Sequence, residues 1–121
     1  MTTSIIRKNN VQTLRNEYRN AKTESVIEGV NKKIREDIIS KCLSSTSFSL
    51  VERETSKPVF IDWSHVKDII ELIERGGWDV HVVGYIDETK VTTNDPLVFN
   101  KMDISGPISH RPKLLISQDN S

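Results

Sequence analysis

The spacing of apolar residues changes at Trp78, which separates a predicted helix from a predicted strand. Within residues 64–75 the branched aliphatic residues recur at i, i+3, i+4 and i+7, so they share one helix face. Ser64 can supply an N-cap hydroxyl, with Asp62 as a competitor, and Gly76 can supply a left-handed residue that ends the helix. The residues on the apolar face are Val66, Ile69, Ile70 and Ile73.

From Trp78 to Ile86 apolar and mixed positions alternate, which is typical of a strand with one buried face. Gly84 interrupts the alternation and indicates a bulge or a close backbone approach. Burying four aliphatic side chains does not offset the conformational entropy lost when a helix of this length becomes ordered. The helix of residues 64–75 must therefore pack on a sheet that contains this strand.

Residues 11–43 carry two different helical patterns in succession. The first is a narrow seam with coiled-coil-like 3-4 spacing, and the second, from Ile27, is a broader stripe typical of a core-facing helix. Ser25 and Glu28 form a capping box, which leaves a restart near Ser25 open, and Gly29 indicates a kink. We expect one continuous helix, with Gly29 as the position where it could kink. The seam consists of Val11, Leu14, Tyr18, Ala21 and Ser25.

The remaining elements are shorter. Residues 44–47 read as a turn, 48–54 as a strand, and either 90–93 or 97–99 as a further strand. The sequence therefore predicts an α+β fold, with a small antiparallel or mixed sheet of three to four strands and helices on one face. The predicted organisation has three parts: a basic N-terminal helical arm (1–24), an α/β core domain (25–99) and an extended C-terminal tail (100–121). Within the tail, residues 113–117 (KLLIS) could either add as a strand to the sheet of another chain or fold back as an edge strand on their own domain.

Formal net charge is zero overall, but charge is unevenly distributed along the chain. The arm holds five basic residues against two acidic ones, whereas residues 58–121 are net acidic. No apolar run approaches the about 20 residues of a membrane span, and no signal-peptide core is present, so we expect no membrane partner. The single Cys42 lies in an apolar helical context and is predicted to be a small buried hydrophobe.

Residues that could perform chemistry are few and scattered. No phosphate-binding glycine motif and no pair of closely spaced cysteines occurs. Asp62, His65 and Asp68 recur at three-residue steps, but a surface helix start with a capping aspartate explains them better than a metal. His81 near Asp79 and Tyr85 is read as a half-exposed strand histidine. The sequence thus predicts no catalytic, metal or cofactor residues and no enzyme.

A helix rich in Ile and Lys, a Ser/Thr turn, the strand FSLVER and the segment IIELIERGGWDVHVV follow one another within residues 27–86. This order resembles small α/β proteins encoded by large tailed bacteriophages, and it includes a pattern of Leu72, Gly77, Trp78 and Val80. The arm and the tail lie outside the resemblance. The resemblance implies a virion component or a host-takeover factor, located in the virion or the host cytoplasm, and assigns no functional residues.

Three functions remain as hypotheses. The leading one is a non-enzymatic phage structural subunit that assembles with itself, as a homo-oligomer, or with other virion proteins through its N-terminal arm and C-terminal tail. The second is a host-takeover or anti-defence binder that sequesters a host protein or a nucleotide signal, with a pocket between subunits near Trp63, His81 and Tyr85. The third is weak nucleic-acid binding by the basic arm. The predicted interaction residues are Val11, Leu14, Arg15, Tyr18, Arg19, Leu114, Leu115 and Ile116.

Overall fold

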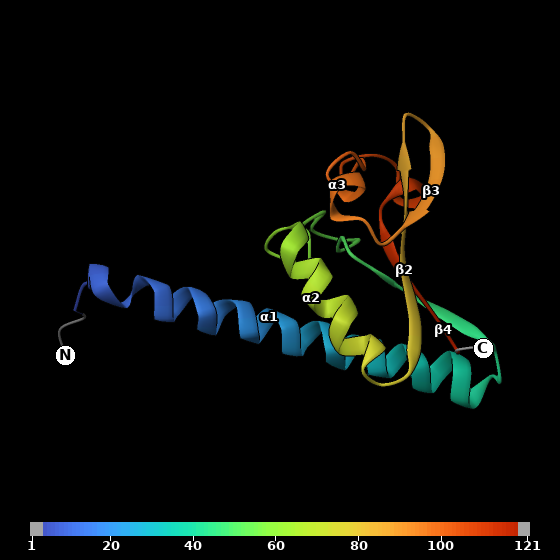
Figure 1. The fold of residues 1–121 in the computed structure, drawn as a ribbon, viewed down its shortest axis with the longest axis horizontal. Helices are drawn as coiled ribbons and strands as arrows, with labels where there is room; N and C mark the ends of the chain where they lie inside the picture. The colour runs from blue at the N-terminus through green and yellow to red at the C-terminus, as the bar shows by residue number, and fades with distance from the viewer. Residues whose placement is uncertain (1–3, 119–121) are drawn as a thin grey trace.

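The structure is a computed structural model, and it describes residues 4–118. It confirms the predicted α+β class: the C-terminal part of a long N-terminal helix and a second, shorter helix both pack against a four-stranded antiparallel sheet (Figure 1). Residues 1–3 of the predicted arm and 119–121 of the predicted tail lie outside the described residues. The elements are η1 (Lys8–Asn10), α1 (Val11–Lys33), η2 (Ile34–Ser40), β1 (Ser45–Ser49), α2 (Trp63–Glu74), β2 (Trp78–Ile86), β3 (Thr89–Thr93), α3 (Pro96–Phe99), η3 (Ile108–His110) and β4 (Lys113–Gln118).

The strand order in the sheet is β1-β4-β2-β3, so the last strand of the described chain lies inside the sheet. On one side Leu114 of β4 pairs with Phe48 of β1, and on the other it pairs with Val82 of β2. The C-terminal segment is therefore extended, as predicted, but it is not a free tail. It is an inner strand because alternate residues, Leu114 and Ile116, bury their side chains completely.

One strand prediction is wrong in its bounds, and one of two alternatives for a further strand is confirmed. β1 begins at Ser45, inside the predicted turn, and ends at Ser49, so residues 50–54 are not part of the strand. Pairing with β4 explains this, because the ladder forms along serine-rich backbone that local propensity assigns to a turn. Of the two predicted locations for a further strand, the structure has the first, as β3 (Thr89–Thr93). The second, Leu97–Phe99, belongs to α3.

The long helix continues without a restart at Ser25. α1 runs directly into η2, a π-helical segment that ends at Ser40, so the prediction of one continuous helix is confirmed. Gly29 lies in the interior of α1. A Cβ at this position would lie 2.5 Å from Cε2 of Phe48, so the close approach of the Phe48 ring favours glycine here. Cys42 follows η2 with a φ of 56° and is exposed, so the prediction of a buried thiol is wrong.

α2 begins one residue before the predicted N-cap. Asp62, not Ser64, caps the helix, since its Oδ1 accepts from the backbone N–H of His65 at 2.9 Å and from the Ser64 hydroxyl at 2.6 Å. The hydroxyl of Ser64 and the backbone N–H of His65 lower the pKa of the Asp62 carboxyl. At the other end, Gly77 rather than Gly76 adopts the left-handed conformation, with a φ of 89°.

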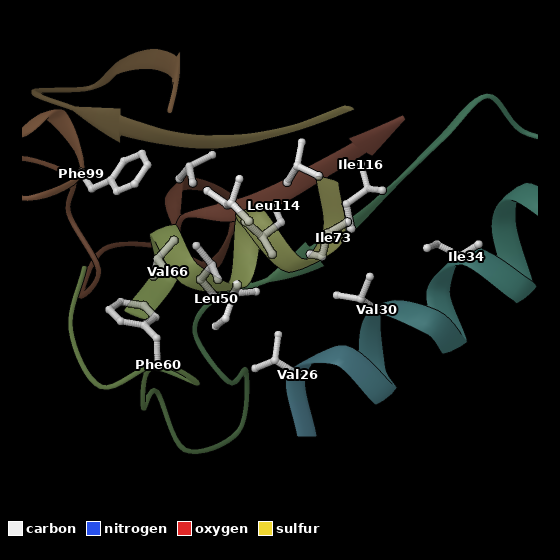
Figure 2. Packing of buried hydrophobic residues seen from close by; sticks show 14 of the residues in the cluster. Val26, Val30, Ile34, Leu50, Phe60, Val66, Ile73, Phe99, Leu114 and Ile116 are labelled. Carbon is white, nitrogen blue, oxygen red and sulfur yellow. The ribbon is translucent and has the colours of Figure 1, made fainter. Parts of the chain in front are cut away.

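The hydrophobic core lies between the helices and one face of the sheet. Val26, Val30 and Ile34 of the long helix project toward α2 and the strands (Figure 2). Behind α2, the same core takes in Val80 and Val82 of β2. The β2–β3 pairing continues through Gly84 without a bulge. Gly84 is instead a position of close approach, because Met102 occupies the space where a Cβ would lie. Among residues 4–118 no helix combines the length and the apolar character that a bilayer crossing requires.

Candidate functional site: the overhang of α1

The N-terminal part of the long helix extends beyond the body of the molecule (Figure 1). Every residue from Ser4 to Tyr18 is exposed except Val11, which is partly buried. We call residues 4–18 the overhang. It presents large apolar side chains to solvent, including Ile6 at 67%, Leu14 at 39% and Tyr18 at 60% exposure. An exposed apolar stretch of this length on a helix has no role in the core.

The overhang ends where α1 first meets α2, at a group of polar contacts. The Arg19 guanidinium donates to the Asp68 carboxylate and lies 4.0 Å from that of Asp62. One turn later, the Thr23 hydroxyl lies 2.7 Å from Nε2 of His65 and donates to the Arg19 carbonyl at 2.9 Å. We call Arg19, Thr23, His65, Asp62 and Asp68 the polar latch. It fixes the direction in which the overhang leaves the body.

His65 occupies the centre of the polar latch and is fully buried. Its Nδ1 accepts from the backbone N–H of Ile61 at 3.1 Å, so Nδ1 carries no proton. The neutral ring must then carry its proton on Nε2, which donates to the Thr23 hydroxyl. Burial, and secondarily the charge of Arg19, lowers the pKa of His65, while Asp62 and Asp68 oppose this shift. The latch therefore requires a neutral histidine.

The predicted seam and the buried stripe point in different directions around α1. At about 100° per residue, the mean direction of Val11, Leu14, Tyr18 and Ala21 lies about 120° from that of Val26 and Val30. The exposures agree, since Tyr18 and Ala21 are exposed while Val26 and Val30 are each 2% exposed. The seam therefore lies off the helix face that packs into the core, and only Tyr18 at its edge borders the chain segment before α2.

Two hollows adjoin the overhang. One, of about 340 Å³, lies between the overhang and the chain segment before α2, where Ile61 is also exposed. The other, of about 280 Å³, lies on the overhang itself. Arg15 and Tyr18 line both hollows. The second hollow is almost entirely apolar and is lined by Ile6, Val11, Leu14, Arg15 and Tyr18.

The structure separates the predicted interaction residues into two groups. Val11, Leu14, Arg15 and Tyr18 lie together on the overhang, whereas Arg19 is engaged in the polar latch. The three from the C-terminal segment belong to β4: Leu114 and Ile116 are buried in the core, and Leu115 is half-buried on the opposite sheet face beside His81. The β4 residues are thus already engaged in the sheet and the core of this chain, and they do not contribute to the surface of the overhang.

The residues of the hypothesised pocket do not converge within one chain. Trp63 packs between the rings of Phe60 and Phe99 at the core. The strand register places His81 and Tyr85 on the face of β2 opposite Val80 and Val82. There His81 contacts Asp79 and Asn94, and the Tyr85 ring stacks on His110 with centroids 4.1 Å apart.

The sequence placed His65 at a surface helix start with a capping aspartate. The helix start and the Asp62 cap are confirmed, but the surface placement is wrong because His65 is fully buried. A signal was available: His65 precedes Ile69 by four residues and Ile73 by eight, so it lies on the buried stripe of α2. No group of three or more His, Cys, Asp or Glu side chains within the described part of the chain is placed to hold a metal ion.

Comparisons of this chain with protein-family models, with curated proteins and with solved structures found no match. The assignment of function therefore depends on the geometry of the overhang.

Proposed function

We propose that this protein is a non-enzymatic assembly subunit that binds another protein chain through the overhang of α1. The observation that carries the proposal is the exposure of residues 8–18, apart from the partly buried Val11, at the start of a helix whose other end is anchored in the core. A helix with few buried contacts is marginally stable in water, and an apolar face that packs on nothing is typical of a protein-binding surface. The overhang fits helix-in-groove or helix-pairing recognition.

The polar side chains near the overhang support a structural role rather than a catalytic one. His65 is buried and held by Ile61 and Thr23, and Asp62 caps α2. Both residues thus serve contacts between elements of the fold. The setting in a bacteriophage virion remains a prediction from the resemblance of residues 27–86.

Nucleic-acid binding by the arm is the weaker alternative. The polar latch draws Arg19 onto Asp62 and Asp68, which leaves Arg7, Lys8 and Arg15 as the basic residues of the overhang. Glu17 partly offsets their charge. Such a small positive charge gives weak phosphate binding that falls steeply with salt. The binder hypothesis is likewise weaker, since Trp63 lies on the other side of the sheet from His81 and Tyr85.

The proposal is tested by replacing Tyr18 with a photoreactive phenylalanine analogue in cells that make the protein. The seam position should give a covalent adduct with another polypeptide, and the mass of the adduct shows whether the partner is a second copy or a different protein. The matched control carries the analogue at Asn20, which is exposed on the same helix but lies off the seam. Leu14→Lys should remove the adduct at position 18.

Equal adduct yields at positions 18 and 20, unaffected by Leu14→Lys, would contradict a binding role for the seam. Nucleic-acid retention tests the alternative separately. If the purified protein binds DNA with a steep salt dependence, and Arg15→Gln reduces that binding, the basic overhang serves phosphate contacts instead.

A further inference from the structure

We infer that the overhang pairs with the overhang of a second copy as a parallel two-stranded coiled coil. The contact face would be Val11, Leu14, Tyr18 and Ala21. This inference rests on the proposed function and adds the identity of the partner and its orientation.

The seam has the spacing and the free space that such pairing requires. Val11 and Tyr18 occupy a positions and Leu14 and Ala21 occupy d positions of a heptad, the two positions that form the contact face of a coiled coil. None of these four residues belongs to the core cluster, and Figure 1 shows α2 and the strands gathered on one side of α1. A second helix can therefore approach the seam without displacing any contact of the core.

The seam is also bounded in length. Continuing the same heptad beyond Ser25 brings Glu28, Lys32 and Arg35 to the d, a and d positions. Charged residues at successive contact positions end a coiled-coil interface. Pairing is thereby confined to the stretch from Val11 to about Ser25, next to the polar latch that orients it.

The charges beside the seam distinguish the two orientations of a pair. The e edge carries basic residues, Arg15 and Lys22, and the g edge carries acidic ones, Glu17 and Glu24. In a parallel pair a g residue faces the e residue five positions later in the partner, so Glu17 meets Lys22 of the second copy, twice by symmetry. In an antiparallel pair e faces e and g faces g, which brings Arg15 near Arg15 and Glu17 near Glu17.

Contacts within the single chain agree with this arrangement. The ammonium group of Lys22 lies 5.4 Å above the ring of Tyr18, so it already extends along the edge of the seam. Glu17 and Lys22 form no ion pair with other residues of the described chain. Both charges are therefore free to meet a second copy.

Disulfide trapping tests the orientation in the full-length protein. Cys42 is exposed, so it is first replaced by Cys42→Ser. Ala21→Cys is then oxidised in that background, and Asn20→Cys serves as the control on the same turn. In a parallel pair the two residues at position 21 face each other within disulfide reach, and the covalent dimer should form at least about tenfold faster for Ala21→Cys than for Asn20→Cys.

Charge reversal provides a second readout that does not depend on a new thiol. Sedimentation of Glu17→Lys and of Lys22→Glu should each show weaker self-association than the wild type. The double variant Glu17→Lys/Lys22→Glu should regain it, since the attraction is restored with the signs exchanged.

Several results would overturn the inference. Faster trapping between Val11→Cys and Ala21→Cys than between two copies of Ala21→Cys would show an antiparallel pair. A wild-type protein that stays monomeric at every concentration would exclude self-pairing. In that case a seam-dependent adduct with a different protein would leave the proposed function in place and refute only this inference.

Discussion

The two ends of the long helix share one backbone and differ in almost everything else. The C-terminal part, from Val26 through Ile38, packs four aliphatic side chains into the core. In the overhang, by contrast, residues 4–18 are exposed, apart from the partly buried Val11. Helix formation is cooperative, so the anchored part supplies the nucleus from which the overhang extends. The role of a residue in this helix therefore depends on the direction and burial of its side chain rather than on its membership of the helix.

The largest expected difference between the two parts concerns stability. Ile34→Ala should lower the free energy of unfolding by about 2 kcal/mol or more, because Ile34 is 8% exposed and its loss leaves a cavity. Leu14→Ala on the overhang should change it by less than about 0.5 kcal/mol. Urea unfolding of both variants at low protein concentration measures the comparison. Similar costs at the two positions would show that the overhang packs on the body.

The polar latch at the boundary should make stability depend on pH. The pKa of His65 lies below its ordinary value of 6.5 in the folded protein. The unfolded chain therefore takes up a proton first, and stability present above pH 6.5 is lost as the pH falls below it. His65→Asn keeps an acceptor for the Ile61 N–H but loses the Thr23 contact and the titration. The substitution should lower the free energy of unfolding by on the order of 1–3 kcal/mol at pH 8.

The difference in the free energy of unfolding between the wild type and His65→Asn should then become smaller as the pH is lowered from 7 to 5. Thermal melts across this range measure it. A constant difference would mean that protonation of His65 is not coupled to folding. The Asp62 carboxyl does not interfere, because its pKa lies below 3.8 and its contribution is lost only at more acidic pH.

Helix propensity and packing should compete at Gly29 but not on the exposed surface. Gly29→Ala gains about 1 kcal/mol of helix propensity, but its Cβ would meet the Phe48 ring at 2.5 Å. We expect Gly29→Ala to lower the free energy of unfolding by about 1 kcal/mol in the wild type and to raise it in a Phe48→Leu background. Asn20→Ala, which is exposed, should be slightly stabilising. A gain from Gly29→Ala alone would mean that Phe48 moves aside at little cost.

The smallest expected effect sharpens the comparison most. Leu14→Lys/Tyr18→Lys should leave the free energy of unfolding within about 0.5 kcal/mol of the wild type, because both side chains are exposed in the single chain. The same variant should lose concentration-dependent association in sedimentation experiments. A strongly destabilised variant would show that the seam belongs to the fold rather than to an interface.

Local patterns predicted the elements whose partners lie nearby in sequence. The helix–strand unit of α2 and β2 follows from the change of period at Trp78. One of the two predicted locations for a further strand, 90–93, lies in β3, which follows β2 after a turn in which Asp87 and Glu88 both adopt positive φ. The class of the fold and the continuity of the long helix were also predictable. Each of these features depends on residues within a few turns or one hairpin of each other.

The parts that were not predictable depend on distant contacts. β1 is serine-rich and becomes a strand through its ladder with β4, and KLLIS reads as a tail until it is placed between β1 and β2. Likewise, Gly29 is explained by the Phe48 ring and not by its own helix. For the candidate site, the 3-4 spacing predicted the seam on the overhang, whereas the links from Arg19 and Thr23 to α2 required the relative placement of two helices.

The central place of β4 has a consequence for how fast the molecule folds. Within the described chain β1 and β2 share no ladder and are joined only through β4, which pairs Ser45 with Ser117 across most of the polypeptide. Contacts between residues so far apart close large loops, and proteins rich in them fold slowly. Until β4 docks, β1 and β2 expose unpaired backbone that can recruit other chains. Refolding should therefore be slow and prone to aggregation at high concentration, in contrast to the rapid folding of helical bundles of similar size.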